Sequence, residues 1–165
     1  ASVPDDLELA LTAVRGGETF DLMRRRDGSF THDKLPPGDY QLLGSSRTHQ
    51  VLPQRIGVAA AAEPVLVTFQ LLAAPALRVV VELSVQQRAQ MAYSATLTVR
   101  DHTGAVVLRR DLGGMFHGRV DAELCEWVAL PKGDYTLELD DRWQPLRAKV
   151  TVRDDGGEVR FARRE

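Results

Sequence analysis

The sequence predicts an all-β protein built from two tandem antiparallel β-sandwich domains of Greek-key type. Three observations support this prediction. The phrase at residues 35–42 (LPPGDYQL) returns in the second half of the chain at residues 130–137 (LPKGDYTL). Short runs of alternating apolar residues are separated by closely spaced turn signals rich in Gly, Pro and Asp. No window shows convincing helical periodicity, and residues 86–92 favour one helical turn at most.

Both copies of the repeated phrase follow the same physical logic. Proline ends the preceding strand, glycine supplies a free backbone for the turn, and aspartate favours a local bond from its side chain to the backbone. Tyr40 and Tyr135 then open new strands with alternating faces. We expect these tyrosines to hold equivalent positions, and a superposition of the two modules to align further pairs: Leu35 with Leu130, and Phe69 with Phe161.

The first module is expected at residues 1–72 and contains about six strands. Alternation predicts strands at 7–11, 19–23, 39–43 and 64–71, with turns at 16–17 and 27–28. Phe30 and His32 precede the repeated phrase, and residues 54–59 are expected to form a polar loop. A counterpart of the strand predicted at 77–85 is missing. Either residues 1–3 are its remnant, or the module boundary cuts off sequence upstream of them.

Residues 73–76 form a short linker, which leaves residues 77–165 for the second module. Because this linker is too short to be flexible over any distance, the two modules should be close neighbours. Seven strands are expected in the second module, and residues 111–118 should form a loop. Alternation and turn signals place the strands at 77–85, 95–100, 105–109, 119–130, 133–140, 146–152 and 158–162.

The long segment before the second LPKGDY phrase contains a conflict of phase. Val120, Ala122 and Leu124 alternate in one phase, whereas Cys125 and Trp127 alternate in the other. A β-bulge between Ala122 and Cys125 would reconcile them, because one extra residue reverses the facing of those that follow. We therefore expect Cys125 and Trp127 to point inward, which would leave the thiol buried and slow to react.

Composition excludes several classes of function. The net charge is −2, so the chain presents no basic field to nucleic acid, and no apolar run is long enough to span a membrane. A single cysteine excludes an intramolecular disulfide, and the absence of asparagine excludes N-linked glycosylation. The four histidines are widely spaced, and we expect neither a metal nor a cofactor. The first five residues lack the features of a signal peptide and are expected to be a mature end.

The pattern resembles the carboxypeptidase regulatory-like, or transthyretin-like, β-sandwich superfamily, which includes the B-type repeats of bacterial collagen adhesins. The signature consists of Asp-Gly-x-Phe followed by Leu-Pro-x-Gly-x-Tyr. It is found here at residues 27–30 with 35–40, and in reduced form at residues 130–135, where Gly118-Arg119-Val120 replaces the first part.

The resemblance implies a non-enzymatic structural or protein-interaction subunit, or an accessory region of an envelope assembly. A periplasmic or extracellular location is the corresponding expectation, with a protein partner. Two alternatives stay open: a carbohydrate-binding module, and the accessory domain of a peptidase whose catalytic part lies elsewhere. Sugar binding would need exposed coplanar aromatics, for which only Tyr93, Phe116 and Trp143 are available.

The candidate interaction residues are Met115 and Phe116, at the tip of the glycine-rich loop, and the cations Arg24, Arg25 and Arg26. Apolar groups on an exposed loop often mark a contact surface. The run of three arginines favours a solvated face, with an acidic partner surface as the sharper alternative.

Other polar groups are expected to be ordinary surface or turn residues. Ser45 and Ser46 lie near His49 in the sequence without a nucleophile-elbow motif. Lys149 could enter an isopeptide bond, as in some adhesin repeats, but it has no marked partner. In strands, alternate arginines of the 24–26 and 109–110 runs should face opposite sides, so that one arginine of each run could lie against a neighbour and bury its stem. For the 109–110 pair too, a solvated face is the expected state and an acidic partner surface the sharper alternative.

Overall fold

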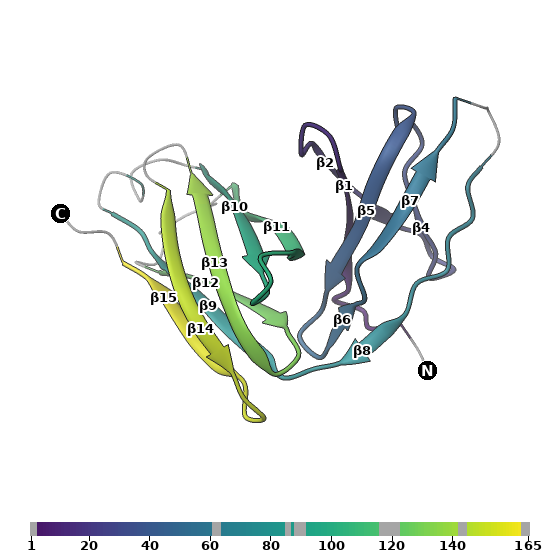
Figure 1. The fold of residues 1–165 in the computed structure, drawn as a ribbon. Helices are drawn as coiled ribbons and strands as arrows, with labels where there is room; N and C mark the ends of the chain where they lie inside the picture. Colours follow the sequence, from purple (N-terminus) through teal and green to yellow (C-terminus); the bar gives the residue numbers. More distant parts are fainter. Residues whose placement is uncertain are drawn as a thin grey trace.

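The computed structural model describes residues 3–60, 64–84, 87, 92–115, 123–141 and 145–162, and these residues form fifteen β-strands. The all-β prediction is confirmed. The strands fall into two groups that lean apart and meet near the short connection from β8 to β9 (Figure 1). In the described part of the chain, no helix is long and apolar enough to cross a membrane.

The first group of strands is dominated by one antiparallel sheet with the order β2-β1-β5-β7. β6 follows β5 after a turn, pairs antiparallel with the end of β5, and pairs along its length with β8. β3 and β4 form a separate two-stranded hairpin. The bounds are β1 (Glu8–Ala13), β2 (Thr19–Asp21), β3 (Met23–Arg24), β4 (Phe30–Thr31), β5 (Gly38–Ser45), β6 (His49–Val51), β7 (Gln54–Val58) and β8 (Leu71–Ala73).

The second group of strands contains two sheets. One has the order β11-β10-β13-β14, and the other has the order β12-β9-β15, in which β15 runs parallel to β9. The bounds are β9 (Ala76–Glu82), β10 (Ala92–Arg100), β11 (Val106–Met115), β12 (Glu123–Ala129), β13 (Gly133–Asp141), β14 (Leu146–Val152) and β15 (Gly157–Phe161).

The repeated phrase occupies matching places in the two groups. The order β2-β1-β5-β7 has the same antiparallel pairing as β11-β10-β13-β14, and the phrase leads into β5 and β13. The Tyr40 hydroxyl donates to the Pro36 carbonyl at 2.6 Å, and the Tyr135 hydroxyl donates to the Pro131 carbonyl at 2.8 Å. Each tyrosine therefore ties its strand to the proline four residues earlier.

The buried apolar residues form two separate clusters. Among the described residues, one cluster takes its buried members from residues 7–56, and the other takes them from residues 77–161. The second is the larger because the sheet β12-β9-β15 covers the inner face of β10 and β13. In the described residues of the first group, no strand corresponds to β9. The assignment of domains to 1–72 and 77–165 stays a prediction.

Three of the expected elements differ in the structure. Residues 54–58 form β7 rather than a polar loop. Ile56 is the one buried apolar residue of this strand, so the strand gives only a weak signal in the sequence. Of the strand predicted at 64–71, only Leu71 lies in a strand. β11 continues to Met115, because Gly113 and Gly114 pair with β10, and long-range pairing here overrides the loop tendency of two glycines.

The prediction that Cys125 points inward is wrong. β12 pairs with β9 without a break from Glu123 to Ala129, and Leu124 and Val128 pack toward the core. Cys125 is exposed and accepts a hydrogen bond from Arg78 at 3.3 Å, and Trp127, on the same face, is half-buried. In the described part of β12, the residues in register with Leu124 therefore face the core, and those in register with Cys125 face away from it. Ala122 and the residues before it lie outside the described residues.

The exposed thiol predicts rapid labelling of the native protein. In Ellman's assay without denaturant, Cys125 should react at a rate within about tenfold of that in urea, because exposure removes the barrier that burial imposes. The variant Cys125→Ser controls for background. A native rate slower by orders of magnitude would restore the inward assignment.

Two turn glycines with the same backbone angle form a matched pair for a stability test. Gly104 and Gly156 both have φ of +85°, which L side chains rarely adopt. A Cβ added to Gly104 meets nothing within 4 Å, whereas one added to Gly156 overlaps the carbonyl oxygen of Ala76.

Gly104→Ala should therefore cost only the backbone penalty, about 1 kcal/mol. Gly156→Ala should cost about 3 kcal/mol, since β9 must also shift. Urea unfolding of both variants measures the difference, and equal losses would contradict the close packing of the turn against β9.

Candidate functional site

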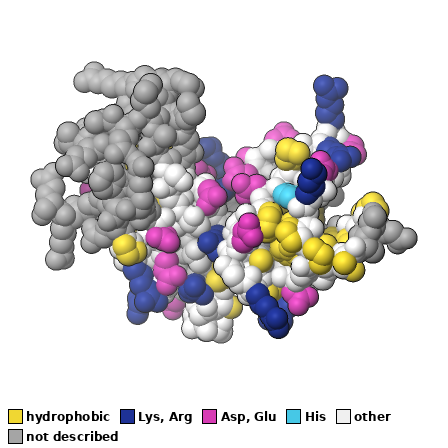
Figure 2. Space-filling model, turned by 90° about the horizontal axis from the view of Figure 1, so that it is seen from above, with side chains coloured by type: hydrophobic (Ala, Val, Ile, Leu, Met, Phe, Trp, Pro, Cys, Tyr) yellow, Lys and Arg dark blue, Asp and Glu magenta, His cyan; other side chains and the backbone are white. Residues whose placement is uncertain are grey.

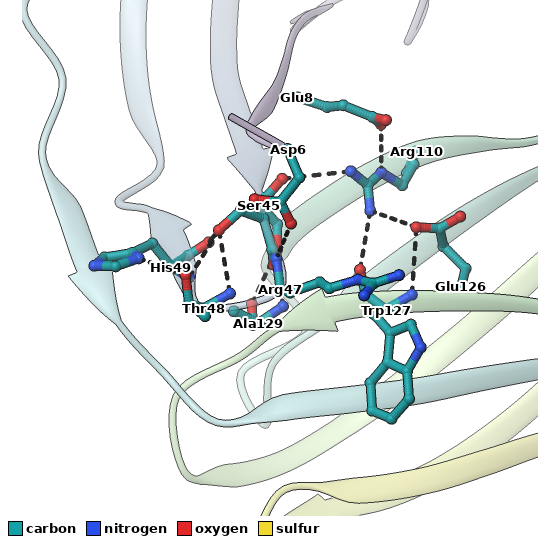
Figure 3. Close-up of polar contacts among 11 residues, drawn as sticks. Asp6, Glu8, Ser45, Arg47, Thr48, His49, Arg110, Glu126, Trp127 and Ala129 are labelled. Atoms are coloured by element: carbon teal, nitrogen blue, oxygen red, sulfur yellow. Dashed lines mark hydrogen bonds and ion pairs between the residues drawn. The ribbon is translucent and has the colours of Figure 1, made fainter. Parts of the chain in front are cut away.

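Arg110 lies at the junction of the two groups of strands and is the most deeply buried charged side chain among the described residues (8% exposed). From β11, its Nε donates to Glu8 Oε2 of β1 at 2.6 Å, and Nη1 donates to Glu126 Oε1 at 3.1 Å. Nη1 also donates to the Trp127 carbonyl at 3.1 Å, and Nη2 donates to the Ser45 carbonyl at 3.4 Å (Figure 3). One guanidinium thus bonds to both groups of strands.

The expectation of a solvated face is wrong for Arg110, whose guanidinium is enclosed by these acceptors. The residue shares its phase in β11 with the buried Leu108 and Leu112. An arginine at the apolar phase of a strand is the signal that could have identified this site in the sequence. A buried guanidinium must find acceptors for its donors, so its partners have to come from neighbouring strands.

Two serines at the end of β5 add a second link. The Ala129 amide donates to Ser45 Oγ at 2.9 Å, and it also lies 2.8 Å from the Ser46 carbonyl. Ser46 Oγ accepts hydrogen bonds from the backbone amides of Thr48 and His49, which close the turn between β5 and β6. Both serines are 1% exposed. The serines near His49 are therefore buried at the end of β5 and in the turn that follows it, and not in a surface loop as the sequence led us to expect.

Two glutamines bond to the free edge of β11. Gln41 Nε2 donates to the Val106 carbonyl at 3.2 Å, and Gln50 Nε2 donates to the Val107 carbonyl at 3.1 Å. Val107 lies where the pairing of β10 with β11 shifts register, so its carbonyl is left for an outside donor. Arg109 Nη1 donates across the junction to the Gly17 carbonyl at 2.7 Å. Sequence reasoning missed both glutamines, because a polar residue in a strand gives no sign of its partner.

A groove of about 390 Å³ runs beside this junction, between β1 and β11. Asp21, Glu8 and Asp111 line it together with the three arginines 24, 109 and 110. Partial burial, followed by the negative charges of Asp111 and Glu8, raises the pKa of the Asp21 carboxyl above its usual value. The groove therefore disfavours the ionised form of Asp21, chiefly through burial.

The three candidate arginines of the sequence lie on and beside the hairpin of β3 and β4. Arg24 donates to the carbonyls of Pro4 and Val3 and lies over the Phe30 ring, 5.8 Å from its centroid. Arg25 donates to Thr31 Oγ1 at 3.1 Å, and Arg26 is exposed. Arg24 is therefore bonded to the backbone of residues 3 and 4, while Arg25 and Arg26 face outward.

The other candidate residues are only partly described. Met115 forms the last residue of β11 rather than a loop tip, and Phe116 and Trp143 lie outside the described residues. Lys149 is exposed on β14. Among the described residues, no group of three or more His, Cys, Asp or Glu side chains is placed to hold a metal ion.

No protein-family model matches the chain, and no curated protein matches its sequence. Among solved structures, the chain is similar to the TIE protein of Bacillus anthracis, at 12% sequence identity and a TM-score of 0.35. The match covers 94% of this chain and 30% of that chain, so the chain spans less than a third of the protein it matches. A likeness this distant identifies no function.

The raised pKa of Asp21 predicts how stability depends on pH. Because the folded pKa lies above the unfolded value, ionised Asp21 destabilises the fold at pH values above the folded pKa, and this effect fades as the pH falls through it. Asp21→Asn should therefore raise the melting temperature by about 1 °C at pH 7, a small effect for an exposed group. The gain should vanish near pH 3.

Asp101 provides a control of opposite sign. Its pKa is lowered, first by the hydrogen bond from the Thr103 hydroxyl and further by the backbone amides of Thr103 and Ala105, so its carboxylate stabilises the fold above the unfolded pKa. Asp101→Asn should lower the melting temperature at pH 7. A loss for both variants would show that the groove does not disfavour the Asp21 charge.

Proposed function

We propose that this chain is a non-enzymatic structural and protein-interaction region in which the two groups of strands act as one stiff unit. The observation that carries this proposal is the enclosed Arg110 guanidinium, which bonds to Glu8 and Ser45 on one side of the junction and to Glu126 and Trp127 on the other. A joint that satisfies a buried cation from both sides favours a single relative orientation.

The polar groups at the junction further support a structural role. Ser45, Ser46 and Gln50 are all at most 3% exposed, and each makes hydrogen bonds that fix strand ends or join the two groups. Here their hydrogen-bonding capacity is taken up within the chain.

The finer assignment is to the transthyretin-like superfamily, as a part of an envelope-associated or extracellular assembly. It rests on the repeated turn–tyrosine phrase and on the shared order of the two four-stranded sheets. Modules of this kind serve many tasks, so the fold alone does not choose among them. The stiff junction favours a spacer role, in which the chain holds a contact surface at a fixed distance from the rest of the assembly.

Distance measurements between spin labels test the stiffness of the joint. Labels at Arg26→Cys and Asp155→Cys, exposed positions in the two groups of strands, are placed in a Cys125→Ser background. Double electron–electron resonance should give one narrow distance distribution. Arg110→Ala should broaden it and cost about 2 kcal/mol of unfolding free energy, because it leaves Glu8 and Glu126 without their shared cation.

Arg100→Ala is the matched control. Arg100 pairs with Glu138 at 3.0 Å within one sheet, and both side chains are about one-third exposed. Its loss should cost less than about 1 kcal/mol and leave the distribution narrow. A broad distribution in the parent protein, or an unchanged one in Arg110→Ala, would refute the stiff joint.

A further inference from the structure

The two groups of strands meet around an enclosed cation whose anionic partners are open to water. The side chain of Arg110 is 8% exposed, whereas those of its carboxylate partners Glu8 and Glu126 are 68% and 38% exposed. Arginine keeps its charge throughout the acid range, while glutamate loses its charge there. Protons can therefore reach the two anions of the junction, and the cation that these anions neutralise stays charged.

Further charges from neighbouring elements face the same junction. Two grooves flank Arg110, and besides Glu8 and Glu126 their charged lining consists of four aspartates and three arginines: Asp5, Asp6, Asp21 and Asp111, and Arg24, Arg47 and Arg109. Six carboxylates against four guanidinium groups, Arg110 included, give a local charge of −2. Seen from above, acidic side chains lie beside basic ones on the surface between the two groups of strands (Figure 2).

Acid reverses the sign of this local charge. When all six carboxylates are protonated, only the four guanidinium groups remain charged, and the local charge becomes +4. Arg24 and Arg47 belong to the first group of strands, while Arg109 and Arg110 belong to the second. These cations then repel one another across the junction, and the enclosed Arg110 loses its compensating charge. Acid therefore weakens the contact between the two groups.

Two neighbouring titratable groups do not cause this weakening. Partial burial is the main reason why the pKa of the Asp21 carboxyl is raised, so the loss of its charge relieves an unfavourable interaction and opposes the loosening. The ring of His49 points away from Arg110, and its Nδ1 lies 2.9 Å from Thr48 Oγ1 (Figure 3). The carboxylates that bond to Arg110 are therefore the groups whose protonation weakens the junction.

Each group of strands has the means to stay folded when the junction loosens. The two apolar clusters share no residue, and among the described residues no carboxylate is buried in either of them. Hydrogen bonds from the hydroxyls of Ser29 and Thr103 lower the pKa of the turn carboxylates Asp27 and Asp101. These turns therefore keep their bonds to a lower pH than turns with ordinary aspartates would.

We propose that the Arg110 junction is an acid-sensitive joint. It holds the two groups of strands in one orientation near neutral pH, and it releases them when Glu8 and Glu126 take up protons, while each group stays folded. This inference rests on the proposed stiff unit and adds the condition under which the stiffness is lost. In an acidic surrounding, the stiff spacer becomes a hinged pair of modules.

The spin-label pair at Arg26→Cys and Asp155→Cys, in the Cys125→Ser background, measures the joint as a function of pH. Distance distributions are recorded from pH 7 to about pH 3, the range in which carboxylates titrate, with circular dichroism of the same samples. The distribution should be narrow at pH 7 and at least twice as wide in acid, at a pH where the circular dichroism is still that of the folded protein. A return to pH 7 should restore the narrow distribution.

Glutamine variants separate the two charges from the general effects of acid. Glu8→Gln combined with Glu126→Gln keeps the size of both side chains and an acceptor oxygen on each, so the distribution should already be at least twice as wide at pH 7. Glu138→Gln is the matched control, because Glu138 is 34% exposed and bonds to Arg100 within one sheet. This control should stay narrow at pH 7 and widen in acid as the parent protein does.

Three results would overturn the proposal. Widening that occurs only as the circular dichroism signal is lost would show that acid unfolds the strands instead of releasing the joint. Widening centred near pH 6.5, the ordinary range of histidine, would assign the change to another group. An unchanged distribution in the double glutamine variant would show that the two charges do not hold the joint. A broad distribution of the parent protein at pH 7 would instead refute the stiff unit, and this inference with it, so the two failures are distinguishable.

Discussion

The need to satisfy one buried guanidinium governs how the two halves of this protein meet. Arg110 takes two of its four acceptors from backbone carbonyls, those of Ser45 and Trp127, and these atoms are fixed by their strands. The carboxylates of Glu8 and Glu126 supply the compensating charge from opposite sides of the junction. Because a displaced joint would leave a buried cation without partners, small rotations are costly.

The rest of the junction is polar for a related reason. β11 and the end of β12 present backbone groups toward the junction. Gln41 and Gln50 donate to carbonyls of β11, and Ser45 Oγ accepts from the Ala129 amide. Directional bonds of this kind contribute less free energy than an apolar interface of the same size, but they tolerate only one register. The two apolar cores therefore stay separate while the halves are held together.

The sequence was most informative where the physics is local. The Pro-x-Gly-Asp-Tyr turns and the strands that follow them depend on neighbouring residues, and β5 and β13 begin where the phrase predicts. Prediction failed where the structure of a segment depends on residues that are distant in the sequence. Gly113 and Gly114 join β11 because β10 lies beside them, and Cys125 turns outward because β9 fixes the phase of β12. Arg110 could be placed on a strand, but its acceptors come from segments far away in the chain.

The same strand order supports two very unequal cores. Among the described residues, seventeen buried residues form the cluster built on β9–β15, against seven in the cluster built on β1–β7. The difference lies in the sheet that should cover β1 and β5, where the structure has only a short hairpin and an extended run without strand neighbours among the described residues.

A sheet with one face only partly covered gains less from the hydrophobic effect, and its open edges invite pairing with other chains. The Arg110 joint offsets part of this weakness, because it couples the smaller core to the larger one. The half with the smaller described core is thus tied to the half with the larger one.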